Sequence, residues 1–182
     1  WDVVADERMG TALPSPTSDL LYFKQQAKPV KARLGRQDVT DRIAMVDTLA
    51  ADPGRLDGRF IGRLLEPLAM EIEFDRALDA PGRPVLLLDA WVEYPYSQTM
   101  FAAWQANRSY DSITIEAQDA DGQWVMLHDK IGYPAGMPRR SVFPLEHIPV
   151  GCRSLRLTTD LELYIDAASV AFVEPCLDAV IH

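Results

Sequence analysis

The chain has 182 residues, a length that favours a single domain with room for a two-layer core. A net charge of −9 argues against a broad nucleic-acid surface, because phosphate binding draws on clustered lysine and arginine. The longest apolar run, residues 84–88, has the length of a strand, whereas a membrane-spanning helix needs roughly 18 apolar residues. The sequence begins at Trp1 and not at a methionine, so we expect a processed or excised piece of a longer chain.

The first 19 residues show no hydrophobic periodicity and contain two prolines separated by one serine. This composition is typical of a linker, so residues 1–19 are predicted to form an N-terminal arm. The remaining chain is predicted to form a domain over residues 20–176, followed by a short tail, residues 177–182.

The first part of the domain alternates in the manner of strands. Residues 20–25 and 29–34 are predicted as two short strands, the second because every other residue is apolar. Residues 38–51 have spacing closer to the helical period, which predicts a short helix or an irregular turn. Residues 69–74 alternate most regularly and are predicted to bury one face of a strand.

The middle of the chain holds the best core strand and a helix. Residues 85–94 begin as a continuous apolar run, which is typical of a central strand covered on both faces. Residues 96–106 have helical spacing and are predicted to cross one end of the sheets. Residues 112–118 and 123–128 are predicted to pair as a hairpin, because an Asp-Gly step lies between them.

The last part of the chain supplies the closing strands. A loop rich in glycine and proline, residues 132–138, is expected to cross between sheets. The further predicted strands are residues 140–145, 154–159, 162–165 and 168–173. Strands that recur without intervening long helices predict a mostly β fold: a two-sheet antiparallel β-sandwich or jelly roll, with one or two short helices.

The sequence contains no familiar catalytic motif. Its three histidines, His128, His147 and His182, are scattered, and the nucleophile elbow, the metalloprotease His-Glu pair and the phosphate-binding glycine loops are all missing. We therefore predict that the chain is not an enzyme. A hydrolase or lyase that uses paired carboxylates is the alternative, but 27 acidic residues offer too many pairs for the spacing to single one out.

The two cysteines are too few for a zinc site. Cys152 and Cys176 could instead form one disulfide, which would close a loop of about 25 residues and add roughly 3 kcal/mol of stability. A bridge and two free thiols stay open as alternatives.

No cofactor is predicted. Calcium is the alternative, since Asp119, Asp121, Asp129 and Asp166 offer the oxygen ligands that this ion prefers. The glutamate that ends a calcium-binding EF-hand loop is missing, however, and turn formation explains the Asp119 to Gly122 run.

Aromatic side chains are dense between residues 91 and 110. The pattern favours a core position for Trp91 and Trp104, and Trp124 is expected to face the core from its strand. Tyrosines flank Pro95 at a strand end, where loops on rigid scaffolds often carry function. The predicted ligand-binding or partner-binding residues are Tyr94, Tyr96, Trp104 and Tyr133.

Four segments, residues 86–94, 119–124, 132–136 and 159–166, resemble in order and spacing the C-terminal β domain of bacterial FG-GAP/VCBS-repeat, ASPIC-type or tetratricopeptide-repeat proteins. The chain departs from that pattern within residues 158–166. The resemblance implies an accessory domain of an exported protein, periplasmic or extracellular, and it supplies no catalytic residue. More distantly, the strands resemble galactose-binding-type jelly rolls and carbohydrate-binding modules.

Two functions follow as hypotheses. The preferred one is a non-catalytic interaction module that docks onto other subunits or domains of a larger exported assembly. The alternative is a carbohydrate-binding module that uses Tyr94, Tyr96 and the loop at residues 132–138 to bind a glycan. An exposed aromatic pair favours the alternative, and an extended arm with a broad apolar patch favours docking.

Overall fold

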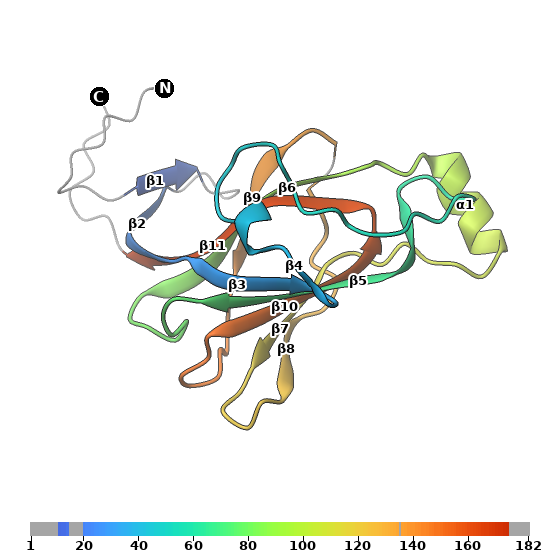
Figure 1. Cartoon of the computed structure of the whole chain (residues 1–182). Helices are drawn as coiled ribbons and strands as arrows, with labels where there is room; N and C mark the ends of the chain where they lie inside the picture. The colour runs from blue at the N-terminus through green and yellow to red at the C-terminus, as the bar shows by residue number, and fades with distance from the viewer. Residues whose placement is uncertain (1–10, 15–19, 135, 175–182) are drawn as a thin grey trace, which may run out of the picture.

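The computed structural model describes residues 11–14, 20–134 and 136–174, which form two antiparallel sheets packed face to face (Figure 1). The first sheet has the order β1 (Thr11–Pro14), β2 (Leu20–Ala27), β11 (Leu163–Glu174), β6 (Arg83–Val92), β9 (Arg139–Pro144). The second has the order β4 (Gln37–Asp38), β3 (Pro29–Leu34), β5 (Arg63–Phe74), β10 (Ser154–Leu161), β7 (Thr114–Gln118), β8 (Trp124–His128). The described helices are α1 (Ser97–Gln105) and the short 3-10 turn η1 (Thr40–Arg42). The predicted mostly β sandwich is confirmed.

The hydrophobic core lies between the two sheets and follows from the alternation of the strands. Met70, Ile72 and Phe74 of β5 are fully buried, whereas the glutamates between them are exposed. β6 is buried on both faces, as its continuous apolar start predicts. Leu86 joins the main core, and Leu87 joins a second cluster on the outer face of the first sheet.

Two elements differ from the prediction, and a third is confirmed. Thr11–Pro14, within the segment assigned to an arm, pairs with β2 as strand β1. Residues 38–51 contain the short 3-10 turn η1 and irregular chain, as predicted, and two β-bridges, Ala44 to Ala167 and Ala51 to Ile165, hold this segment beside β11. The strands expected at residues 162–165 and 168–173 are one strand, β11, whose register shifts between Ile165 and Ala167.

Two tryptophans expected in the core lie on outer faces. Trp91 stacks on Tyr164 of the neighbouring strand, with ring centroids 5.4 Å apart. Trp124 lies under the guanidinium of Arg156 at 4.6 Å, because the register of the hairpin places it beside Gln118 on the outer face of the second sheet. Flat rings that stack on polar neighbours fill these positions without entering the core.

Helix α1 lies at one end of the sandwich, together with several of the loops that connect the strands. β6 leads into α1, and the segments that begin β5 and β7 lie at the same end, away from the start of β2 and the end of β11 (Figure 1). No helix in the described part of the chain is long and apolar enough to cross a membrane.

Candidate functional site

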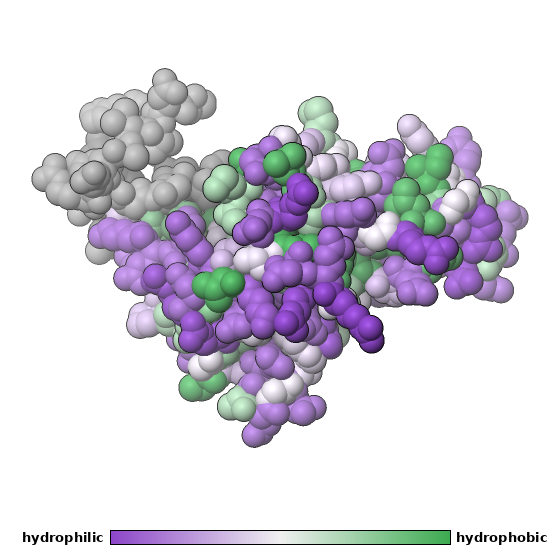
Figure 2. Space-filling model, in the orientation of Figure 1, coloured by the Kyte–Doolittle hydropathy of each residue, from purple (hydrophilic) through white to green (hydrophobic). Residues whose placement is uncertain are grey.

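Helix α1 presents large aromatic side chains to solvent. Its predicted position is confirmed, but only Ala103 is buried. Phe101 is 58% exposed and Trp104 69% exposed, and their rings stack with centroids 5.7 Å apart. Trp104, for which the sequence pattern favoured the core, is therefore on the surface, and Ala103 is the one residue of the helix that is buried. Figure 2 shows apolar side chains among polar ones at this end of the molecule.

The C-terminal end of α1 borders an open hollow lined by Trp104, Gln105, Asn107, Arg108 and Ser109. Asn107 has a φ of 52°, in the left-handed region, and its backbone N–H donates to the Trp104 carbonyl. The Arg108 N–H donates to the Ala103 carbonyl at 2.8 Å. These two bonds are the Schellman pattern that ends helices, and they fix the backbone of the hollow relative to the Trp104 ring.

The other predicted site residues lie near the base of α1. Tyr94 is 48% exposed and contacts Tyr133, with ring centroids 6.4 Å apart, whereas Tyr96 is 61% exposed and forms the N-cap of the helix. Burial raises the pKa of Tyr133. The structure thus brings Tyr94 and Tyr133 together, and pairs Trp104 with Phe101 on the helix.

A close backbone contact holds the base of α1 against the loop before β5. Gly62 has a φ of 77°, and a Cβ at this position would lie 2.4 Å from the Glu93 carbonyl oxygen and 3.2 Å from the Pro95 ring. The Gly62 carbonyl also accepts a hydrogen bond from the Glu162 N–H. Only glycine fits here, so the position of the chain entering α1 depends on it.

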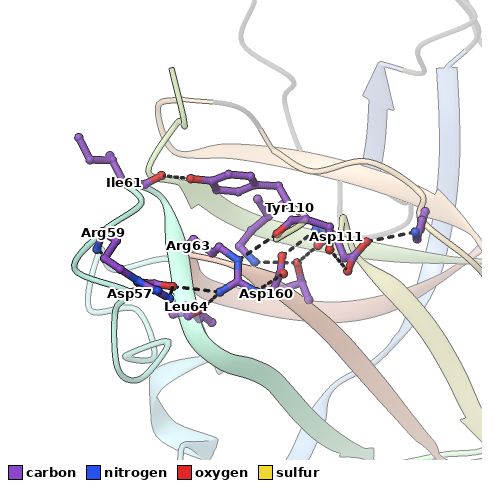
Figure 3. A network of polar contacts seen from close by, with 12 residues as sticks. Asp57, Arg59, Ile61, Arg63, Leu64, Tyr110, Asp111 and Asp160 are labelled. Atoms are coloured by element: carbon purple, nitrogen blue, oxygen red, sulfur yellow. Dashed lines mark hydrogen bonds and ion pairs between the residues drawn. The ribbon is translucent and has the colours of Figure 1, made fainter. Parts of the chain in front are cut away.

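A buried arginine ties the same loops to β10 (Figure 3). Arg63 donates to Asp57 at 3.3 Å and to Asp160 at 3.1 Å, and its Nε donates to the Ser109 carbonyl, next to the hollow. All three charged side chains are less than a tenth exposed. Buried charges need such partners, because an unpaired one is costly to remove from water. The network therefore holds the backbone at Ser109, which lines the hollow.

The pKa values of the carboxylates in and beside this network are shifted in different directions. Hydrogen bonds from Arg59 lower the pKa of Asp57 to about 2, despite its burial. Burial raises the pKa of Asp160, opposed by a hydrogen bond from the Asp111 N–H. Hydrogen bonds from Ser109 and Lys130 lower the pKa of Asp111. Asp57 and Asp111 are thus held as partnered carboxylates at neutral pH.

Sequence reasoning missed the residues that build this end. The pairing of Arg63 with carboxylates far away in the chain leaves no local pattern. For Asn107 there was a signal, since asparagine directly after a predicted helix often occupies the left-handed position at its end.

The remaining candidates lie elsewhere. Cys152 is buried and free among the described residues, and Cys176 lies outside them, so a bridge stays a prediction. Asp119 accepts hydrogen bonds from the N–H groups of Asp121 and Gln123 in the predicted hairpin turn. Within residues 11–14, 20–134 and 136–174, no group of three or more metal-ligating side chains could hold a metal ion.

Comparisons with known proteins extend the description of the fold only. No family model matches the chain, and no curated protein matches it. The suggested relation to FG-GAP/VCBS-repeat, ASPIC-type or tetratricopeptide-repeat proteins therefore has no support.

Two solved structures are similar to the chain over most of its length. One is titled CpGH89CBM32-6 from Clostridium perfringens; it has 12% identity and a TM-score of 0.40, over 78% of this chain and 92% of that one. The other is an F5/8 type C domain of a Bacteroides fragilis protein, with 12% identity and a TM-score of 0.37, over 69% of this chain and 84% of that one. At this similarity no residue's role is transferred, and the candidate site rests on the geometry of this chain alone.

Proposed function

We propose that the chain is a non-catalytic carbohydrate-binding module, and that the α1 end of the sandwich binds the sugar. The observation that carries the proposal is the exposed Trp104 ring beside the hollow of Gln105, Asn107, Arg108 and Ser109. The proposal differs in place from the sequence hypothesis, which centred the sugar site on Tyr94, Tyr96 and residues 132–138.

The chemistry of the hollow fits a sugar. A pyranose ring has one face of C–H groups that packs on an aromatic ring, and hydroxyls around its rim that need donors and acceptors. Trp104 offers the apolar surface, and the amide, guanidinium and hydroxyl groups beside it offer the polar partners. Tyr94 and Tyr96 are also exposed, so their rings are available to extend the contact along a longer glycan.

A glycan array followed by calorimetry tests this proposal. We expect wild-type protein to bind at least one oligosaccharide, and Trp104→Ala to weaken that binding at least about tenfold, or ~1.4 kcal/mol, because the stacking surface is lost. Trp124→Ala is the matched control, since it removes the same side chain from the outer face of the second sheet. Equal binding by the wild type and Trp104→Ala, or no binding to any glycan, contradicts the proposal.

Docking onto a partner subunit is the second candidate, because one loop carries its own apolar patch. Met45, Val46 and Leu49 are 63%, 57% and 57% exposed, and the two β-bridges to β11 hold their loop in place. Native purification from the source with mass spectrometry tests it. We expect the chain inside a larger exported assembly from which Leu49→Ser is released, whereas a lone monomer would rule the docking role out.

A further inference from the structure

The cations at the α1 end differ in whether a carboxylate neutralises them. Arg63 is shared between Asp57 and Asp160. Arg59 also pairs with Asp57, and its partner lies at 3.0 Å. These side chains serve the network that holds the loops, and their charge is cancelled within it.

Arg108 has no such partner among the described residues. Its side chain is exposed, it lines the hollow beside Trp104, and no carboxylate of the described residues forms an ion pair with it. Its backbone is fixed by the hydrogen bond to Ala103 at the end of α1. The side chain therefore starts from a fixed backbone at the same hollow as the aromatic ring.

The acidic residue nearest to Arg108 in the sequence, Asp111, already has other partners. The Asp111 carboxylate accepts hydrogen bonds from the Ser109 hydroxyl at 2.8 Å and pairs with the Lys130 ammonium at 3.1 Å. Asp160 is buried under Arg63. The hollow thus presents one positive charge without a carboxylate partner, in a chain whose net charge is −9.

We infer that the sugar bound at this hollow is acidic, with its carboxylate against the guanidinium of Arg108 and its ring against Trp104. This inference rests on the proposed function and narrows its ligand class. The planar, forked guanidinium matches a carboxylate with two parallel hydrogen bonds, which a neutral hydroxyl cannot accept in the same way. The polar groups of Gln105 and Asn107 then remain for the ring hydroxyls.

The test uses a panel of uronate-bearing and sialate-bearing oligosaccharides, each beside its carboxyl-reduced, neutral form. We expect the wild type to prefer at least one acidic member over its neutral form by tenfold or more, and the preference to shrink as salt is raised. Arg108→Gln should bind the acidic and the neutral form with equal affinity, because the charged group that distinguishes the two forms is lost. Arg108→Lys should restore part of the preference, since lysine keeps the charge but not the fork.

Arg36→Gln is the control for net charge, because Arg36 is exposed in the turn between β3 and β4, outside the hollow. It should behave as the wild type. If the wild type binds both forms equally, the acidic specificity is wrong while carbohydrate binding stands. If the wild type binds neither form, both the acidic specificity and the proposed carbohydrate binding are wrong. A preference that survives in Arg108→Gln, or equal binding of a polyglutamate peptide or a sulfated neutral glycan, overturns the assignment.

Discussion

Gly62 shows how one residue positions the site from outside it. Its carbonyl is hydrogen-bonded to Glu162, and its α-carbon lies against the backbone that leads into α1. A side chain here would collide with backbone atoms, which cannot rotate away as a flexible side chain could.

We predict that Gly62→Ala lowers the free energy of unfolding by more than about 2 kcal/mol, because it combines a backbone clash with a positive φ. Urea denaturation measures this. Gly58→Ala is the control in the same loop, since a Cβ there would meet open space, and its cost should stay within about 0.5 kcal/mol. Equal costs for the two variants would refute the structural role of Gly62.

For single residues, the sequence predicted which side chains are buried better than it predicted which aromatic side chains are exposed. Alternation in β5 assigned Met70, Ile72 and Phe74 to the interior, because a strand with one wet face must alternate. The position of Trp104 could not be predicted in the same way. Hydrophobicity favours burial, but burial also requires that the helix pack closely, and only Ala103 of α1 is buried.

The helix α1 depends on how its C-terminal end is closed. Asn107 adopts the left-handed conformation that glycine and asparagine tolerate best. The bonds from Asn107 and Arg108 back to the last turn then place the polar groups of the hollow next to the Trp104 ring.

We predict that Asn107→Ala accelerates hydrogen exchange of the last-turn amides of α1 about fivefold, equivalent to roughly 1 kcal/mol of local stability. Asn107→Gly should leave the exchange rates close to those of the wild type, because glycine enters the left-handed region freely. Mass-spectrometric hydrogen exchange on both variants measures the difference. Unchanged rates in Asn107→Ala would show that the helix end is held by other contacts.

The segment at residues 38–51 illustrates what element prediction lacks. Its spacing predicted a short helix or an irregular turn but not its pairing with β11. The Ala51 N–H donates to the Ile165 carbonyl, and the Ile43 carbonyl accepts a hydrogen bond from the Ala168 N–H. The partner strand lies more than a hundred residues away, so no local pattern reports it. The predicted hairpin at residues 119–122 succeeded for the opposite reason, since both of its strands are neighbours in sequence.

At the scale of the molecule, the fold class followed from counting strands, whereas the order of the strands did not. Recurring short strands without long helices are sufficient to indicate a sandwich. The sheet order places β11 between β2 and β6, and β10 between β5 and β7. The spacing of apolar residues along the chain does not distinguish this strand order from other antiparallel orders. The α1 end of the sandwich forms only when the strands have this order.

The strand order also determines when the molecule can become stable during folding. β10 and β11 follow each other directly in the chain, and each is the central link of one sheet. Residues 154–174 supply the strands that join β2 to β6 and β5 to β7 by hydrogen bonds. Such long-range closure is slow, typically milliseconds to seconds, and leaves strand edges open to other chains meanwhile. A chain cut before Ser154 would therefore divide both sheets at once, and it would lack Asp160, the partner of Arg63 in the network beside Trp104 and Arg108.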